Sequence, residues 1–286
     1  MAGPVATILP DGRRLHLQHG PIDLVIEAWG AADETAAAYR QAVARFADIL
    51  DTLAGELPAL RAPVAGAAPP AVRGPVARRM AAAVWPHRAV FITPMAAVAG
   101  SVADEILVAL TRGRTLERAY VNNGGDIAFH LAPGHALRLG VVADVDAPAL
   151  DGFATLDAAG PSRGLATSGW RGRSFSLGIA DAVTVFADTA AAADAAATIV
   201  ANAVDADHPA IARAPARSLD PDSDLGGLPV TTVVGTLPPG IVDGALDRGA
   251  SVAGDLLRRH LIHAATLMLQ GRTRVVGALA PAVAIR

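Results

Sequence analysis

Residues 119–131 read AYVNNGGDIAFHL, two short apolar runs on either side of an Asn-Asn-Gly-Gly-Asp turn. Asn-Gly supplies the positive φ that a tight hairpin turn requires, so the stretch predicts two neighbouring antiparallel strands. A second interpretation stays open, because paired glycines expose backbone amides and let a ligand approach closely. On that interpretation the candidate binding residues are Asn123, Gly124, Gly125 and Asp126.

Apolar runs of the same kind flank this hairpin on both sides. Residues 5–29 read as an antiparallel meander. Further strands are expected at residues 137–143, 153–156, 182–187, 230–234 and 274–279. Because Gly, Asn and Pro separate the central runs without an intervening helix, antiparallel pairing is favoured over parallel crossover units.

Helical periodicity occurs in four segments. One-sided or alanine-rich helices are expected at residues 33–58, 93–110, 188–204 and within 241–269. The order helix, sheet, helix, sheet predicts an α+β fold, built as one unit or as two related halves. Residues 58–75 are rich in Pro, Ala and Gly without a period, and are expected to form a surface loop or a domain boundary.

Composition excludes several kinds of chemistry. The chain of 286 residues has no cysteine, and all 24 of its Lys-plus-Arg residues are arginine. Thiolate metal sites, disulfides, Schiff bases and a Walker lysine are thereby excluded. With a net charge of -3 and scattered arginines, nucleic acid is not an expected partner. The start of the chain lacks the pattern of an export signal, and no run of about 18 apolar residues occurs, so we expect a cytoplasmic protein that does not bind membranes.

Two further polar segments are candidates for chemistry. Thr167-Ser168-Gly169 follows a short strand, and hydroxyls beside a glycine suit a ring or phosphate edge, although the same residues can simply cap a loop. Asp194 and Thr198 stand four apart in a predicted helix, so both occupy one face. A carboxylate and a hydroxyl near a helix start suit Mg²⁺ that shares phosphate oxygens with a substrate. The alternative is a solvated aspartate favoured by the helix dipole.

Two tempting matches are interpreted as structural. The segment 160–164, Gly-Pro-Ser-Arg-Gly, has the serine-hydrolase elbow pattern, but strand-like sequence follows where the elbow requires a helix. It is therefore predicted to be a turn. His260 and His263 share a face of the predicted fourth helix, but no third ligand stands nearby in the sequence.

Taken in their order along the chain, the polar segments resemble the ApbE family of FAD:protein FMN transferases. The matching segments are residues 100–104, 123–126, 166–169 and 183–185, followed by Ala193, Asp194 and Thr198. The flanking residues 220–226 and 269–271 are similar to a shorter, functionally uncharacterised branch of that family.

The resemblance implies the ApbE-like variant of the T-fold, an antiparallel sheet with helices packed on one face, in duplicated halves, over residues 1–286 as one domain. It also implies Mg²⁺-dependent chemistry on FAD, in which the FMN phosphoryl group passes to a threonine hydroxyl of an acceptor flavoprotein. Asp194 and Thr198 would hold the metal. The flavin nucleotide would contact Asn123, Gly124, Gly125, Asp126, Thr167, Ser168 and Gly169. A homodimer is a further expectation.

The chain departs from the transferase pattern at two places. Ala99 stands where the transferases have a lysine, and residues 171–176 stand where they have a histidine thought to deprotonate the acceptor. Arginine stays protonated in proteins and cannot replace that base. Two expectations therefore stand side by side, with no catalytic residue assigned: an FMN transferase-like enzyme or FAD-cleaving enzyme, and a flavin- or pterin-binding protein of a cofactor-biosynthesis pathway.

Overall fold

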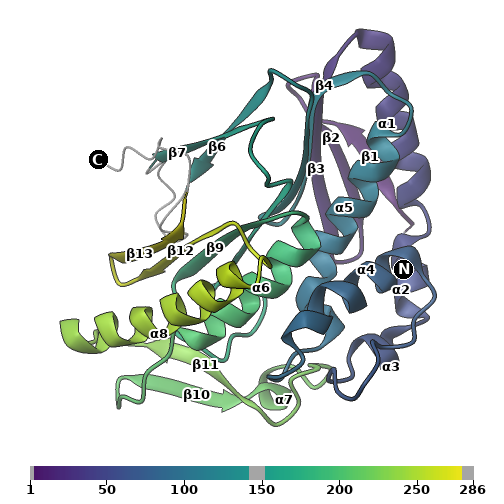
Figure 1. Ribbon diagram of the computed structural model, residues 1–286. Helices are drawn as coiled ribbons and strands as arrows, with labels where there is room; N and C mark the ends of the chain where they lie inside the picture. Colours follow the sequence, from purple (N-terminus) through teal and green to yellow (C-terminus); the bar gives the residue numbers. More distant parts are fainter. Residues whose placement is uncertain (1–2, 142–151, 279–286) are drawn as a thin grey trace.

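The computed structural model describes residues 3–141 and 152–278. Within these residues, nine strands form one sheet in the order β1-β2-β3-β4-β5-β8-β9-β12-β13 (Figure 1). Their bounds are β1 (Val5–Ile8), β2 (Leu15–His19), β3 (Ile22–Gly30), β4 (Leu116–Asn123), β5 (Asp126–Leu131), β8 (Gly164–Ser168), β9 (Ala182–Ala187), β12 (Ala264–Leu269) and β13 (Arg272–Gly277). Every neighbouring pair is antiparallel, as the sequence predicts.

Two small antiparallel strand pairs among the described residues stand apart from this sheet. They are β6 (Ala136–Val141) with β7 (Gly152–Asp157), and β10 (Ile211–Pro215) with β11 (Pro229–Val234). The ends of the predicted strands 137–143 and 274–279 lie partly outside the described residues.

The helices are α1 (Ala32–Phe46), α2 (Ile49–Ala54), α3 (Leu57–Leu60), α4 (Pro75–Val84), α5 (Val98–Thr111), α6 (Ala190–Ala203), α7 (Ala216–Leu219) and α8 (Pro239–Arg258), with 3-10 turns η1 (Trp85–His87) and η2 (Pro94–Ala97). Chain order shows an internal duplication. A hairpin β2-β3, helices ending with α5, and a hairpin β4-β5 are followed by β8-β9, then α6 and α8, then β12-β13. The predicted α+β fold with duplicated halves is therefore confirmed.

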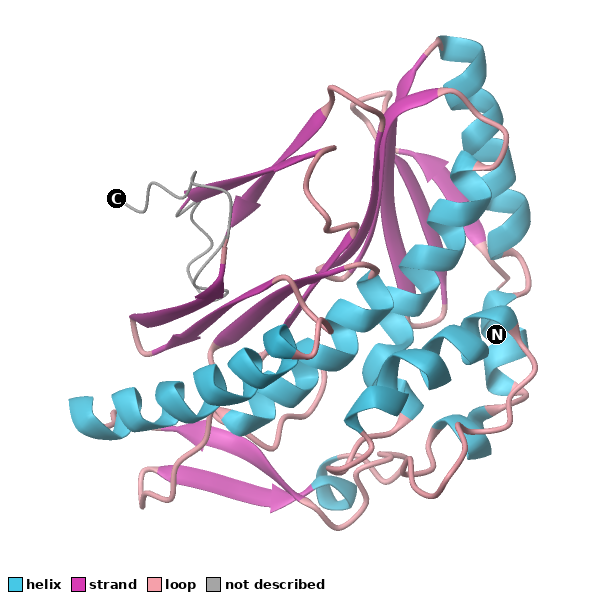
Figure 2. Ribbon diagram, in the orientation of Figure 1, coloured by secondary structure: helices cyan, strands magenta, loops and turns pink. Residues whose placement is uncertain are grey.

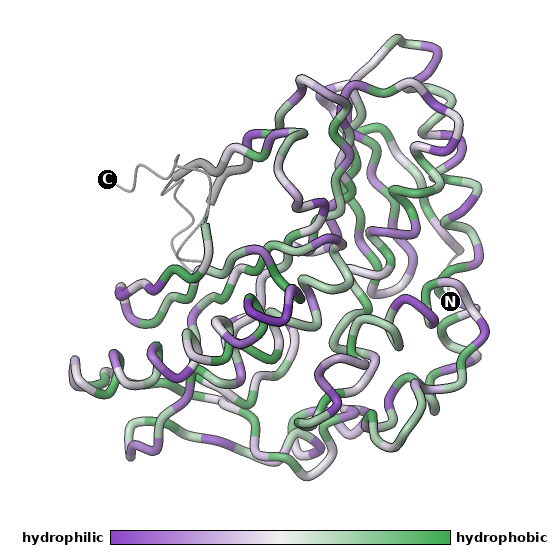
Figure 3. The backbone as a smooth tube through the Cα atoms, viewed as in Figure 1, coloured by the Kyte–Doolittle hydropathy of each residue, from purple (hydrophilic) through white to green (hydrophobic). Residues whose placement is uncertain are grey.

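Helices α1, α5, α6 and α8 cover one face of the sheet (Figure 2). Each half has its own apolar core between sheet and helices, one centred on α1 and α5 and the other on α6 and α8. The β6-β7 hairpin adds a small cluster on the opposite face, where Leu137 and Leu156 contact Phe129. Figure 3 shows the hydrophobic stretches concentrated on the strands and on the helices that cover them.

The first turn of α6 fits tightly between α5 and β8. A Cβ atom at Gly100 would overlap the carbonyl of Ala190, and one at Gly164 would overlap the Ala190 backbone nitrogen. The buried Asp104 carboxylate accepts hydrogen bonds from the backbone N–H groups of Ala190 (3.0 Å) and Ala191 (2.9 Å). A helix start leaves such N–H groups without intrahelical partners, so Asp104 both satisfies them and complements the helix dipole.

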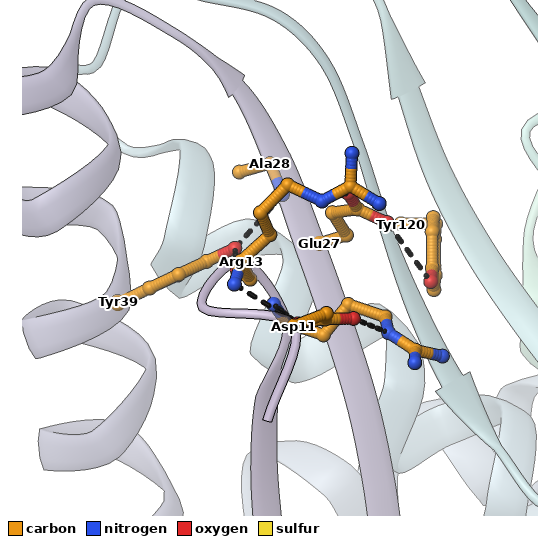
Figure 4. A network of polar contacts seen from close by, with 7 residues as sticks. Asp11, Arg13, Glu27, Ala28, Tyr39 and Tyr120 are labelled. Atoms are coloured by element: carbon orange, nitrogen blue, oxygen red, sulfur yellow. Dashed lines mark hydrogen bonds and ion pairs between the residues drawn. The ribbon is translucent and has the colours of Figure 1, made fainter. Parts of the chain in front are cut away.

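A polar network ties the β1-β2 turn to α1 and β4 (Figure 4). The Tyr39 hydroxyl donates to the Arg13 carbonyl at 2.6 Å and accepts from the Ala28 N–H at 3.2 Å. Glu27 is buried and accepts a hydrogen bond from the Tyr120 hydroxyl at 3.4 Å. Burial and the Glu27 charge raise the pKa of Tyr120 to about 12, so this phenol stays protonated and acts as a donor.

Two of the predicted helices differ from the structure. The segment 33–58 is three helices, because a turn at residues 47–48 redirects the chain and lets Ile49 and Leu53 join the core. The segment 241–269 ends its helix at Arg258, where His260 adopts a positive φ of 56°, and continues as β12. The sequence analysis also missed α4, which follows a mostly exposed connection over residues 61–74.

The predicted loop at residues 58–75 is largely confirmed. After α3 it runs without regular structure to α4, and the N–H of Val64 donates to the carbonyl of Ile92 at 2.8 Å. By length and composition, the segment Pro94–Thr111 is apolar enough to cross a membrane. Here it is a core helix, since it packs on α1, α4, α6 and the sheet.

We expect Gly100→Ala to lower the free energy of unfolding by about 3 kcal/mol, because the added methyl group has no room between α5 and α6. Gly240→Ala, in the first turn of α8, is the matched control, since no atom of the described residues lies within 4 Å of a Cβ placed there. It should be neutral or slightly stabilising. Urea unfolding of the two variants measures both effects, and equal stabilities would refute the tight fit.

Candidate functional site

The turn between β4 and β5 has the predicted hairpin geometry. Asn123 pairs with Asp126 across the turn, and the two glycines between them have φ values of 66° and 111°. The Asn122 side-chain oxygen accepts a hydrogen bond from the Gly125 N–H at 2.8 Å. Gly124 is exposed, whereas Asn123 and Asp126 are buried.

The turn is joined to the beginning of α5 and, through it, to α6. The Asn123 Nδ2 atom donates to the carbonyl of Ala99 at 3.1 Å. The next N–H group, that of Gly100, donates to the Asp194 Oδ2 atom at 3.0 Å. Backbone groups at the start of α5 thus link the hairpin turn to the predicted metal ligand Asp194 by hydrogen bonds. The sequence could not predict this link, because α5 contributes backbone groups to it and not side chains.

Strand β8 reaches the same place. The backbone N–H of Thr167 donates to the Asp126 Oδ1 atom at 3.2 Å. The three polar segments that the sequence singled out therefore converge: the 123–126 turn, the end of β8 and the first turns of α6. They meet at the end of the sheet where α5 begins.

The three residues 167–169 do not all face this place. Ala166 belongs to the core under the helices, and Leu165 to a cluster on the opposite face. Because strand side chains alternate, Ser168 points to the helix-covered face and Thr167 to the other. There the Thr167 hydroxyl lies 2.8 Å from that of Thr184. Thr167 thus reaches the site through its backbone, and its side chain does not share one pocket with that of Ser168.

Gly169 is also structural in part, since a Cβ atom there would overlap the Asp181 carbonyl. Thr198 lies one turn after Asp194 on α6 and is half-buried, as the helical spacing predicts. The two side chains occupy the same face of the helix.

The carboxylates of this site are strongly desolvated. Burial raises the pKa of Asp126 to about 7, and the Thr167 N–H and the Arg173 charge only partly offset it. Burial also raises the pKa of Asp194 well above its ordinary value; the nearby Asp126 charge raises it further, and the N–H groups of Gly100 and Ala99 lower it. Two buried carboxylates, one of which raises the pKa of the other, favour a bound cation between them.

Arg173 is a neighbour that the sequence analysis missed. A Cβ atom at Gly124 would overlap the Arg173 Nη2 atom, so the guanidinium lies against the turn, and its charge lowers the pKa of Asp126. The side chain is exposed on the loop that follows β8. The residue in the sequence that could have indicated this contact is Gly124, since only a residue without a side chain leaves room for the Arg173 guanidinium.

The donor atoms fit a hard divalent cation. Carboxylate and hydroxyl oxygens suit Mg²⁺, which keeps several waters and is completed by substrate phosphates. Among the described residues no group of three or more His, Cys, Asp or Glu side chains could hold a metal ion. A cation at Asp194 would therefore rely on few protein ligands, as Mg²⁺ shared with a phosphate does.

Two cavities lie elsewhere among the described residues. One, of about 330 Å³, borders Asp104 and Thr189 at the start of α6. The other, of about 140 Å³, borders Ser162 and His263 at the opposite end of β8. Neither is lined by Asp126 or Asp194, so neither cavity is the place where the two carboxylates converge.

We expect Asp126→Asn to change how stability depends on pH. The folded protein holds the Asp126 proton more tightly than an unfolded chain, whose aspartate pKa is about 3.8, so ionisation destabilises the fold. Relative to the variant, wild type should lose up to about 1.4 kcal/mol per pH unit between about pH 4 and pH 7. Urea unfolding across this range, without divalent cations, measures the difference. Parallel curves for the two proteins would contradict the burial argument.

Comparison with known proteins identifies relatives of the chain and the family to which it belongs. The curated relatives that it matches include UPF0280 proteins from Methanopyrus kandleri, 37% identical over 134 residues, and Methanococcoides burtonii, 38% identical over 144 residues. These matches cover 47% and 49% of this chain and 51% and 56% of the relatives. The chain thus spans about half the length of the curated relatives it matches.

Solved structures of similar shape include the apo form of the flavinyl transferase ApbE of Pseudomonas stutzeri, with a TM-score of 0.44 and 13% identity, covering 96% of this chain and 92% of that one. The ApbE protein of Thermotoga maritima has a TM-score of 0.37 and 17% identity, covering 65% of this chain and 51% of that one. A family model described as AbpE bacteria matches residues 6–275. The chain therefore belongs to this AbpE bacteria family, which confirms the ApbE-like resemblance of its motifs.

Proposed function

We propose that the protein is a Mg²⁺-dependent, FAD-using enzyme that transfers the FMN phosphoryl group to an acceptor or cleaves FAD. The observation that carries this proposal is the convergence of Asp126 and Asp194, two desolvated carboxylates, beside the N–H of Gly100. Family membership supports the same chemistry.

Asp194 and Thr198 would hold the metal, with the Asp126 carboxylate facing the same place. When bound, Mg²⁺ would neutralise charge on the FAD diphosphate and so assist phosphoryl transfer. The protein's own contribution is positioning. The Gly100 N–H holds one Asp194 oxygen in place, and the Thr167 N–H does the same for Asp126.

The turn with Gly124 and Gly125, together with Ser168, would border the flavin nucleotide. Asn123 would hold the turn in place and not bind the nucleotide directly, because its side-chain amide donates to the Ala99 carbonyl. Arg173 lies against Gly124 and its positive charge acts on Asp126, so a phosphate at the turn would meet this side chain. It supplies a charge in a chain that has no lysine.

A second candidate is a flavin- or pterin-binding protein of a cofactor-biosynthesis pathway that lacks the transfer step. The observation in its favour is the segment after Gly169, where Arg171 and Arg173 stand and no histidine is present to deprotonate an acceptor. In either case we propose a cytoplasmic protein of one domain, with an acceptor flavoprotein as partner only for the transferase, and with a homodimer as its assembly.

We expect Asp194→Asn to weaken Mg²⁺-dependent FAD binding at least about tenfold, since it removes the charge that a metal requires. The asparagine oxygen can still accept the Gly100 N–H, so the fold should persist. Asp33→Asn, an exposed change in the first turn of α1, is the control. Calorimetric titration of FAD with and without Mg²⁺ measures both. Undiminished binding by Asp194→Asn would remove this residue from the site.

Product analysis separates the two candidates. With FAD and Mg²⁺, the enzyme should release AMP, leaving FMN free or attached to an added acceptor flavoprotein. Thermal stabilisation by flavins or pterins without any AMP release would favour the binding protein. If flavins, pterins and nucleotides all leave the melting temperature unchanged, both candidates fail.

A further inference from the structure

A second group of chemically active side chains lies at the other end of β8. The Ser162 Oγ atom is 2.9 Å from the His263 Nδ1 atom. On the other side of the ring, the His263 Nε2 atom is 3.2 Å from the Asp188 Oδ1 atom. A nucleophile within hydrogen-bond reach of a base, which a third group orients, is the arrangement that activates serine in hydrolases.

The arrangement fixes the roles of the imidazole nitrogens. A neutral histidine has one N–H donor and one lone-pair acceptor. Asp188 can only accept, so the proton belongs on Nε2, and the Nδ1 lone pair faces the Ser162 hydroxyl. This ring use is the reverse of that in chymotrypsin-like triads, but either nitrogen can take the proton of a serine.

The backbone around Ser162 and His263 is held by hydrogen bonds. Arg163 Nη1 donates to the carbonyls of Gly160 (2.7 Å) and Ser162 (2.6 Å). These hydrogen bonds hold the loop that carries Ser162. The backbone N–H of His263 donates to the Phe186 carbonyl at 2.7 Å, where β12 joins β9. Ser162 and His263 are both only partly exposed, so the serine hydroxyl is ordered and still accessible.

A cavity of about 140 Å³ opens directly on Ser162 and His263. Its walls are largely apolar and include Leu156, Phe186 and Ala264. The size suits a short acyl group, and the apolar walls suit its methyl end. The cavity therefore stands where the carbonyl carbon of a small ester would meet the Ser162 oxygen.

We propose that Ser162, His263 and Asp188 form a catalytic triad that hydrolyses aryl esters of short carboxylic acids. The Ser162 oxygen attacks the carbonyl carbon, and its proton moves to His263 Nδ1. The bond from carbon to the aryl oxygen then breaks, and His263 returns the proton to that oxygen, which leaves a phenol and an acetylated or similarly acylated Ser162. Water, deprotonated by His263, releases the carboxylic acid and restores the serine.

Aryl esters are the chosen class because a phenolate leaves easily and so asks less of oxyanion stabilisation than an amide does. The expectation that segment 160–164 is not a nucleophile elbow is confirmed, since residues 160–161 form a bend and strand β8, not a helix, follows the serine. The partners of Ser162 instead come from the ends of β9 and the start of β12. This activity is separate from that proposed for Asp194 and does not depend on it.

The test is reaction of the purified protein with diisopropyl fluorophosphate and with p-nitrophenyl acetate. We expect one diisopropylphosphoryl group per chain, located on Ser162 by peptide mass mapping, and a rapid first release of p-nitrophenol. Ser162→Ala should lose both the label and the burst. Ser218→Ala, at an exposed serine whose hydroxyl donates to the Pro215 carbonyl, is the matched control and should retain both.

Label on another serine, absence of label, or an undiminished burst in Ser162→Ala would overturn the proposal. Asp188→Asn provides a second variant if Ser162→Ala folds poorly, because Asp188 is exposed and its substitution leaves the core unchanged. Its labelling rate should fall about tenfold or more, since the ring loses the carboxylate that orients it. An unchanged rate would count equally against the triad.

Discussion

The first turn of α6 is the junction on which the rest of the molecule depends. Its backbone N–H groups at Ala190 and Ala191 donate two hydrogen bonds to the Asp104 carboxylate. A hydrogen bond to a charged group is worth about 1.5–3 kcal/mol. This contact is possible because Gly100 and Gly164 let α5 and β8 come close to the helix backbone. The two halves of the duplicated fold meet here, so the same contact that joins them also sets the position of Asp194, one turn further along.

The site that results places two carboxyl groups where burial disfavours their ionised forms. One or two backbone N–H donors stabilise the ionised form of each carboxyl group, Asp126 and Asp194. Burial destabilises that form by more, so both pKa values are raised. A chain without lysine leaves Arg173 as the nearby cation, and arginine cannot take part in proton transfer. The protein's residues are therefore suited to holding a metal and a phosphate in place, and the identity of any proton acceptor separates the two candidate functions.

Local sequence was sufficient where the fold is decided by neighbouring residues. The Asn-Asn-Gly-Gly-Asp turn, the meander at the start and the one-sided helices all follow from patterns within about twenty residues. The break at residues 47–48 and the strand β12 could not be predicted from local patterns. In both cases contacts with distant residues override the local helical period.

The candidate site was predictable only as a set of segments. Asp126, Asp194 and the end of β8 were found by their polar character and order. The backbone donors of α5 carry no side-chain signal, and the opposite faces of Thr167 and Ser168 follow only once β8 is known to be a strand. The contact between Ser162 and His263 joins residues 101 positions apart, which no local pattern can reveal.

The most direct test of the account is the position of a bound metal. Crystals grown with FAD and Mn²⁺ in place of Mg²⁺ allow the cation to be located by its anomalous scattering. The account predicts a peak within coordination distance of an Asp194 carboxylate oxygen, on the side that faces Asp126, with phosphate oxygens completing the shell. A peak at any other part of the surface, or a bound flavin with no metal near Asp194, would contradict it.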